Sequence, residues 1–325
     1  MTLLEIDSLD VRFHTRRGTA RAVRGISLAV SEGEAVGLIG ESGSGKSVAA
    51  QAIMGLVHSP GRIHGGEIRW QGNDLLADPA LLGRLRGREL AMIFQDPMTS
   101  LNPLLPVGAQ LAEGMRRHLG LDRRAARARA LELLTLVGIH EAERRLKQYP
   151  YEFSGGMRQR VMIAMALACS PRLLIADEPT TALDVTIQAQ VLDLLADLQQ
   201  RLSLSILLIS HDLGVVAGLC RRLAVMYAGQ IVEEGPADQM FERPAHPYTA
   251  GLMRATPGIE SGLNRLISIE GVPPDLLAPP PGCAFAQRCP LAEDRCRQEA
   301  PPPRKDGEHR VACWRPFEPA WESVP

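Results

Sequence analysis

The residues from Gly40 to Ser47 have the composition and order of a loop that binds phosphate groups. They read Gly-Glu-Ser-Gly-Ser-Gly-Lys-Ser, directly after the apolar run 35–39 and directly before an Ala-rich stretch. This order predicts a glycine-rich turn between a strand and a helix, where backbone N–H groups and the positive end of the helix face an anion. We call residues 40–47 the phosphate loop.

The residues of the phosphate loop have separate expected tasks. Contacts to the ligand from the turn are expected at Gly40, Ser42, Gly43, Ser44 and Gly45. Lys46 would reach the terminal phosphates, and the hydroxyl of Ser47 would bind Mg²⁺.

Two adjacent carboxylates, Asp177 and Glu178, directly follow the apolar run 172–176. A buried strand that ends in this way delivers both side chains to the edge of a parallel sheet, where ligands bind. Asp177 would hold Mg²⁺ through water, and Glu178 would polarise an attacking water. Taken alone, an apolar run that ends in Asp-Glu is equally compatible with a simple strand cap. Because this run lies downstream of a phosphate loop, the hydrolytic role is favoured.

A second glycine-backed helix start lies at Ser154, Gly155 and Gly156. Its N-terminal amides suit an anion. The alternative is an ordinary helix cap, in which Ser154 accepts a backbone hydrogen bond and the glycines ease the turn.

The elements that must position these residues can be read from hydrophobic periodicity. Strands are expected as short segments within 3–39 and at 67–70, 90–94, 172–176 and 205–210, with a hairpin at 225–235. Helices are expected within 106–147 and at 157–169 and 186–202. Continuous apolar strands that alternate with helices indicate an α/β fold, with a parallel sheet covered on both faces and an inserted helical lobe.

The segment from Phe153 to Arg160, which reads Phe-Ser-Gly-Gly-Met-Arg-Gln-Arg, resembles the signature motif of ABC ATPases. The other motifs of that family follow in order. Gln95 looks like the Q-loop glutamine, which contacts Mg²⁺ or water; Asp184 looks like the D-loop aspartate; and His211 looks like the switch histidine that touches the γ-phosphate. The resemblance implies ATP and Mg²⁺ as ligands, with Glu178, Gln95 and His211 as the catalytic group.

Phe13 aligns with the aromatic residue on which adenine stacks in this family. Base stacking on a ring tolerates any base and contributes on the order of 1–3 kcal/mol. Two alternatives stay open: Phe13 belongs to the core, or the neighbouring His14 takes the stacking role.

In ABC ATPases the signature of one nucleotide domain closes over the ATP held by another. The resemblance therefore implies that Ser154 and Gly156 serve a partner's nucleotide, while the phosphate loop, Asp177 and Glu178 serve this chain's own. A second ATPase subunit is required, and a related but different chain is expected rather than a second copy.

The resemblance is closest to the ATP-binding subunits of oligopeptide and dipeptide importers. The segment 243–249, Arg-Pro-Ala-His-Pro-Tyr-Thr, and the segment 95–103, from Gln95 to Pro103, are typical of that group. Tyr151 departs from it, because histidine is common there. This subfamily implies two transmembrane permease partners, an extracytoplasmic binding protein and a peripheral position at the cytoplasmic face of the inner membrane. The cargo stays open among dipeptides, longer peptides, nickel chelates and glutathione.

Charge and hydropathy argue against other classes. With 36 Lys and Arg against 37 Asp and Glu, the balance favours no nucleic-acid partner. Apolar runs are too short to span a bilayer, and the start of the sequence lacks the features of a signal peptide, so the expected compartment is the cytosol. A soluble ABC ATPase that acts on DNA or ribosomes would be expected to show two nucleotide domains, a coiled coil or a basic face. A non-hydrolysing regulatory module would lack Lys46 or Glu178.

The composition changes near residue 255, because 13 of the 24 prolines lie from Pro257 onward. We therefore expect a nucleotide-binding domain over 1–255, with a helical subdomain at about 96–165, and an irregular tail over 256–325.

The tail holds Cys283, Cys289, Cys296 and Cys313, whereas Cys169 and Cys220 lie in apolar helical stretches and are expected to pack in the core. The tail spacing lacks the paired Cys-x2-Cys of zinc knuckles. An iron–sulfur cluster, zinc and unliganded thiols are the three options, and the subfamily resemblance implies a [4Fe–4S] cluster.

Overall fold

The structure is a computed structural model and describes residues 1–96, 100–181, 183–256 and 269–316. Three expected features fall partly outside these residues: positions 97–99 of the 95–103 motif, Ala182 before the D-loop aspartate, and Pro257 at the start of the proline-rich tail. The chain divides into two units. The first unit comprises Met1–Ser31, Ala35–Ala77 and Ile209–Pro325; the second comprises Glu32–Glu34 and Asp78–Leu208.

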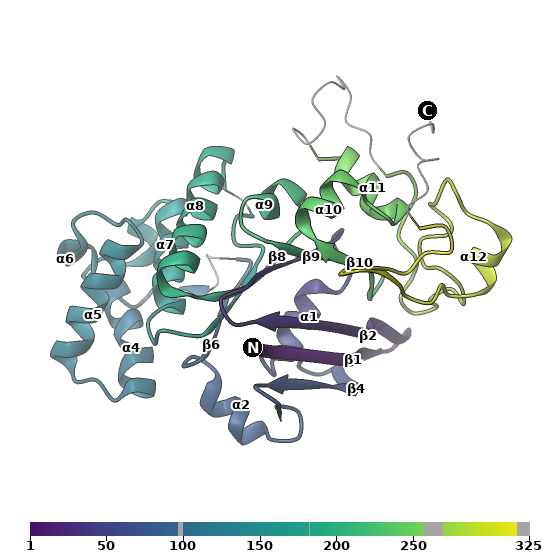
Figure 1. Ribbon diagram of the computed structural model, residues 1–325. Coiled ribbons are helices and arrows are strands. Elements are labelled where there is room, and N and C mark those ends of the chain that lie inside the picture. Colours follow the sequence, from purple (N-terminus) through teal and green to yellow (C-terminus); the bar gives the residue numbers. More distant parts are fainter. Residues whose placement is uncertain (97–99, 182, 257–268, 317–325) are drawn as a thin grey trace. The chain divides into compact units, whose positions relative to one another are not determined.

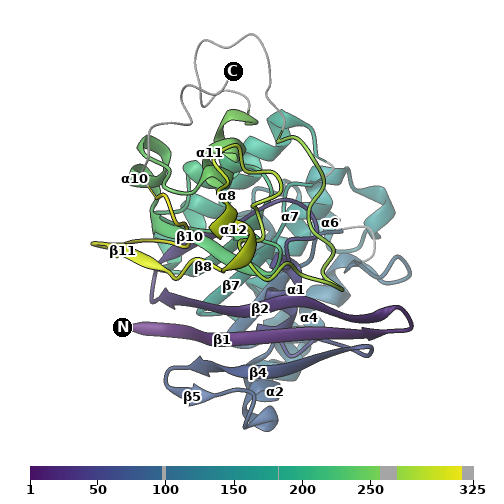
Figure 2. The same ribbon diagram turned by 90° about the vertical axis from the view of Figure 1, so that its right-hand side faces the viewer.

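An antiparallel sheet in the first unit has the strand order β2-β1-β4-β5 (Figure 2). Its strands are β1 (Thr2–Thr15), β2 (Gly18–Ser31), β4 (Gly61–Trp70) and β5 (Asn73–Asp74). The sequence predicted several short strands over residues 3–39, but β1 and β2 are 14 residues each. The register between them shifts between Ile6 and Leu9, where Ser8 has φ 51°. This irregularity breaks the apolar alternation, so one long strand reads as two.

A second set of strands in the first unit follows the order β11-β12-β10-β9-β3. The strands are β3 (Ala35–Ile39), β9 (Arg222–Tyr227), β10 (Gln230–Pro236), β11 (Arg304–Asp306) and β12 (His309–Val311). β3 is buried along its whole length and pairs in parallel with β9. The predicted hairpin 225–235 forms as β9 and β10, and β12 of the tail then pairs antiparallel with β10. The tail therefore extends this sheet.

The helices of the first unit are short. They are α1 (Lys46–Ile53), α9 (Leu213–Ala217), α10 (Ala237–Glu242), α11 (Pro247–Arg254) and α12 (Asp294–Gln298). Among the described tail residues beyond 268, only α12 is helical, with five residues.

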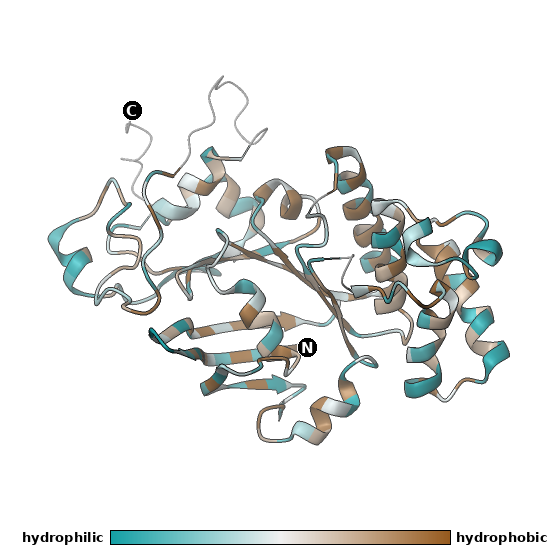
Figure 3. Ribbon diagram, turned by 180° about the vertical axis from the view of Figure 1, so that it is seen from behind, coloured by the Kyte–Doolittle hydropathy of each residue, from teal (hydrophilic) through white to brown (hydrophobic). Residues whose placement is uncertain are grey.

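The second unit contains β6 (Leu90–Ile93), β7 (Leu173–Asp177) and the greater part of β8 (Ser205–Ser210), in the order β8-β7-β6. Its helices are α2 (Pro79–Leu85), α4 (Val107–Leu119), α5 (Arg123–Leu136), α6 (Ala142–Arg145), the 3₁₀ turn Pro150–Glu152, α7 (Gly155–Ala166) and α8 (Val185–Leu202). Figure 1 shows α4, α5 and α6 gathered beside α7. Hydrophilic residues line much of α4 and α5 (Figure 3), whereas β7 is buried along its whole length and β6 at all but one position. The mixed α/β fold predicted from the sequence is confirmed.

Among the described residues, no helix combines the length and the apolar character needed to cross a bilayer.

Candidate functional site

The phosphate loop, in the first unit, has a backbone that only glycine can adopt at two positions. Gly40 has φ 155° and Gly45 has φ 106°. A Cβ atom at Gly40 would lie 2.1 Å from the carbonyl oxygen of Met226, and one at Gly45 would lie 2.3 Å from that of Ala22. α1 then begins without a side-chain cap at its N-terminus. Its first amide groups therefore point to the place where an anion would bind.

Lys46 lies inside the turn it follows, with 4% of the residue exposed. Its Nζ donates to the carbonyl oxygen of Gly40 at 2.6 Å and to that of Glu41 at 3.0 Å. Ser44 is buried beside it, and Ser42 and Gly43 are exposed. The loop thus holds a positive charge where the terminal phosphates of a nucleotide would need it.

Glu178 lies in the second unit, directly after Asp177 at the end of β7. Asp177 is buried, whereas Glu178 has φ 46°, in the left-handed region that costs free energy for a residue other than glycine. The side-chain amide of Gln95 and the hydroxyl of Thr181 each donate to Oε2 of Glu178 at 2.9 Å. These two bonds hold the side chain of Glu178 in place after β7.

The signature residues and Asp184, also in the second unit, all lie at helix starts. Ser154 caps α7 by accepting from the N–H of Met157 at 3.4 Å, and Asp184 caps α8 by accepting from that of Ile187 at 2.9 Å. Ser154, Gly155 and Asp184 are exposed. A Cβ at Gly156 would lie 2.7 Å from Cγ2 of Ile187, so glycine lets α7 and α8 approach. The capping role is thus observed, and the role toward a partner's nucleotide stays a prediction.

His211 and Phe13 belong to the first unit. His211 is exposed after β8, and its neighbours are held by a hydrogen bond from the N–H of Asp212 to the hydroxyl of Ser210 at 2.9 Å. Phe13 is half-buried on β1, where its ring covers Gly61 so closely that a Cβ there would lie 2.7 Å away. Packing therefore accounts for part of the surface of Phe13. The nucleotide contacts of both residues stay predictions.

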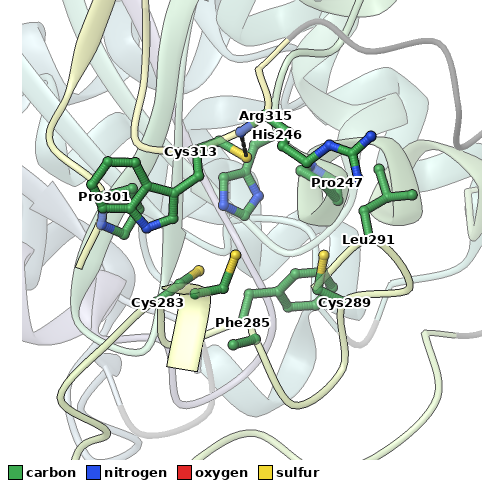
Figure 4. Close-up of a pocket in the computed structure, with 12 residues that line it drawn as sticks. His246, Pro247, Cys283, Phe285, Cys289, Leu291, Pro301, Cys313 and Arg315 are labelled. Atoms are coloured by element: carbon green, nitrogen blue, oxygen red, sulfur yellow. Dashed lines mark hydrogen bonds between the residues drawn. The ribbon is translucent and has the colours of Figure 1, made fainter. Parts of the chain in front are cut away.

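The four tail cysteines line one pocket (Figure 4). All six cysteines of the chain are described and none forms a disulfide; Cys169 and Cys220 are buried, as expected. Burial raises the pKa of Cys289 to about 12 and that of Cys313 to about 11. No group of three or more His, Cys, Asp or Glu within the described ranges has a geometry that could hold a single metal ion.

His246 lines the same pocket and is the N-cap of α11. Its Nδ1 accepts from the N–H of Tyr248 at 3.0 Å. Only 1% of the residue is exposed, and this burial lowers the pKa of His246 to about 4.

Several residues of these sites were missed by the sequence analysis. Thr181 lies in the D-loop segment, but no motif indicates that its hydroxyl bonds to Glu178. Glu41 offers a weak signal, because an acidic residue inside a loop that binds phosphate requires a compensating cation. Nothing in the sequence indicates that this cation is Arg288, whose two terminal nitrogens bond to the carboxylate of Glu41.

Two protein-family models match the chain. The model described as ABC transporter matches residues 23–181. The model described as oligopeptide/dipeptide transporter, C-terminal region, matches residues 232–296. The second match includes most of β10, all of α11 and three of the four tail cysteines.

Relatives of known role are similar along nearly the whole chain. The dipeptide transport ATP-binding protein DppD of Haemophilus influenzae is 50% identical over 98% of this chain and 96% of its own. The oligopeptide transport ATP-binding protein OppD of Bacillus subtilis is 52% identical over 96% of this chain and 88% of its own. A solved dimeric structure of a bacterial ABC transporter cassette is similar with a TM-score of 0.65 and 27% identity, over 72% of this chain and 98% of that one.

Proposed function

Because the chain belongs to the ABC transporter family, as an ATPase with the C-terminal region of the oligopeptide/dipeptide branch, we propose that it hydrolyses ATP to drive the import of peptides. The observation that carries the hydrolytic part is the pair of hydrogen bonds that hold Oε2 of Glu178. A carboxylate fixed in this way can take a proton from a water that attacks the γ-phosphate.

The nucleotide roles are assigned as follows. Lys46 and the amides of the phosphate loop bind the phosphates, and His211 contacts the γ-phosphate. Phe13 stacks on the adenine. Ser47, Gln95 and Asp177 offer hydroxyl, amide and carboxylate oxygens, which are the ligands that Mg²⁺ prefers. When bound there, Mg²⁺ supplies charge neutralisation at the transferred phosphate.

The exposed residues of the second unit serve a second ATPase subunit. Ser154, Gly155 and Gly156 bind the nucleotide of that subunit, and Asp184 lies at the contact between the two. Exposure of Ser154 and Gly155 supports this role, because their surface is available to another chain. The partner ATPase is a related, different chain. ATP bound to both surfaces closes the pair, and loss of the γ-phosphate releases it.

The peptide cargo is supported by the match of the tail region to the oligopeptide/dipeptide transporter family and by the names of the relatives, which are dipeptide and oligopeptide transport proteins. We place the ATPase pair at the cytoplasmic face of the membrane, docked on two permease subunits that receive peptide from an extracytoplasmic binding protein. The nucleotide-binding domain spans residues 1–255, with its helical subdomain at about 96–165, and the tail spans 256–325.

The tail cysteines are assigned to a [4Fe–4S] cluster held by Cys283, Cys289, Cys296 and Cys313. Four thiols that line one pocket supply the number and type of ligands such a cluster needs. A single zinc ion would require the sulfurs to converge at about 2.3 Å from one point, whereas the irons of a cluster each take a different thiolate. The cluster would cross-link and stabilise a tail that has little hydrophobic core of its own.

Purification of the native complex in detergent tests the function. We expect the protein to carry two hydrophobic permeases and a second ATPase, and its ATP turnover in proteoliposomes to rise when a peptide-loaded binding protein is added. Co-purifying nucleic acid, or turnover that responds to a nickel chelate or glutathione but to no peptide, would contradict the proposal.

A further inference from the structure

Glu41, the second residue of the phosphate loop, is held by two residues from distant parts of the first unit. Nη1 and Nη2 of Arg288 donate to Oε2 and Oε1 of Glu41, at 2.7 Å and 2.9 Å. The backbone N–H of Glu41 donates to the hydroxyl of Tyr248 at 2.8 Å. The carbonyl oxygen of Glu41 accepts from Lys46. Glu41 thus connects the phosphate-binding lysine to α11 and to the tail.

Arg288 is itself fixed before it reaches Glu41. Its side chain is 5% exposed. Nε donates to the carbonyl oxygen of Glu270 at 2.9 Å, Nη2 to that of Ile269 at 3.0 Å, and Nη1 to the hydroxyl of Tyr227 at 3.3 Å. The guanidinium lies over the ring of Tyr227 at 5.8 Å from its centroid. A planar cation held on several sides presents a fixed fork to a carboxylate.

The pairing of Arg288 with Glu41 affects phosphate binding because Glu41 carries a negative charge. A carboxylate in the turn that receives a triphosphate repels the ligand unless a cation neutralises it. Arg288 supplies that cation, and the two-bond geometry keeps the carboxylate directed toward the tail. Tyr248, buried beneath the turn, holds the backbone of the same residue. We infer that Arg288 and Tyr248 are positioning residues of the phosphate loop, and that the tail thereby sets the affinity of this chain for ATP.

This inference rests on the proposed ATP-binding role and is tested with the purified full chain. Arg288→Gln should weaken the binding of ATP by about tenfold or more, the size of a lost charge-assisted hydrogen bond. Glu41→Gln should weaken ATP binding less than Arg288→Gln does, and the double variant Glu41→Gln with Arg288→Gln should bind ATP more tightly than Arg288→Gln alone, because no uncompensated carboxylate remains. Arg304→Gln, which removes an exposed arginine of β11, is the matched control and should change nothing.

Three outcomes separate the possibilities. If Arg288→Gln weakens ATP binding equally in the wild-type chain and in the Glu41→Gln chain, the arginine acts through the folding of the tail. That result would overturn the inference. Tyr248→Phe keeps the ring and removes the hydroxyl that accepts from the N–H of Glu41. In the assembled complex this variant should raise KM for ATP several-fold with little change in kcat. A loss confined to kcat would also overturn the inference. A wild-type chain that binds no ATP would refute the proposed function itself.

A second inference comes from an unpartnered atom of His246. The N–H of Tyr248 can only donate, so Nδ1 of His246 must be unprotonated, and the proton of the neutral ring lies on Nε2. Nε2 is buried and has no hydrogen-bond partner among the described residues. Figure 4 shows the imidazole pointing into the pocket between Cys313 and the pair Cys283 and Cys289. A buried donor without an acceptor is unfavourable, and a sulfur acceptor in that pocket would offset this cost.

We propose that Nε2–H of His246 donates a hydrogen bond to a sulfur of the group that the four cysteines hold. Nε2 of His246 cannot act as a metal ligand in this tautomer, because it carries the proton. The inference rests on the proposed [4Fe–4S] cluster, whose reduction potential rises when hydrogen bonds reach its sulfurs.

The potential measured by EPR-monitored titration tests this role without reference to ATP turnover. His246→Asn keeps the N-cap of α11 but cannot reach the sulfur, so we expect full iron content and a more negative potential. His246→Gln, which can extend a side-chain N–H into the pocket, should restore part of the shift. An unchanged potential in His246→Asn at full iron content would overturn the proposal. If the wild type prepared without oxygen contains no iron, both the cluster assignment and this proposal are wrong.

Discussion

The side-chain amide of Gln95 donates to Oε2 of Glu178 at 2.9 Å, across 83 positions of sequence. Both residues belong to the second unit, one after β6 and the other after β7, and these strands are parallel neighbours. Because the two strands end at the same edge, a residue that follows one can touch a residue that follows the other. Gln95 and Glu178, to which we assign the Q-loop and general-base roles, are therefore linked directly.

Replacement of the base should separate binding from turnover. Glu178→Gln removes the proton acceptor and leaves the phosphate loop intact. We expect ATP turnover in the assembled complex to fall by about a hundredfold or more, with ATP still bound. Steady-state phosphate release and equilibrium binding of labelled ATP measure the two effects. Turnover equal to that of the wild type would remove Glu178 from its role.

Thr181 should tune the same carboxylate. Thr181→Val keeps the shape of the side chain and removes the hydroxyl that donates to Glu178. A neutral hydrogen bond contributes about 1 kcal/mol, so we expect kcat to fall about fivefold with KM for ATP unchanged. Thr181→Ser keeps the hydroxyl and is the matched control. If the serine variant is as slow as the valine variant, packing rather than the hydrogen bond explains the loss.

The tail cysteines should control the iron content of the protein. Cys283→Ser or Cys289→Ser removes one ligand, and we expect the brown absorbance and the iron content to fall and the tail to become more sensitive to protease. Cys220→Ser, in a buried residue outside the pocket, serves as the control and should keep its iron. A colourless wild type that contains zinc would reverse the assignment.

The buried carboxylate of Glu233 should be the strongest single anchor of the tail on β10. It accepts from the N–H groups of Ala245 and His246 and pairs with Nε2 of His309 at 2.8 Å. Glu233→Ala would leave buried donors without an acceptor and lower the free energy of unfolding by about 3 kcal/mol. Urea unfolding followed by circular dichroism measures this loss. Glu308→Ala, in an exposed neighbour, should cost little, and an equal loss there would contradict the anchor role.

The sequence predicted the glycine-rich turn between a strand and a helix, and it placed the starts of α7 and α8 within two residues of the observed ones. Glycine spacing predicted a turn after β3, and Ser154 and Asp184 occupy the N-cap positions that their types favour. Such features are local, because a few adjacent residues determine them. The pairing of Arg288 with Glu41 could not be predicted, since 247 positions separate the two residues and neither has a distinctive neighbour pattern.

Pairing of the tail strand β12 with β10 has a consequence for how the protein is made. The ribosome delivers β10 well before β12, and in this interval β10 presents a row of unsatisfied backbone groups on one side. A nascent chain that pauses there exposes a template for pairing with other polypeptides. Slow translation between the two strands should therefore increase aggregation in the cell, whereas faster elongation through the proline-rich stretch should protect the yield of folded protein.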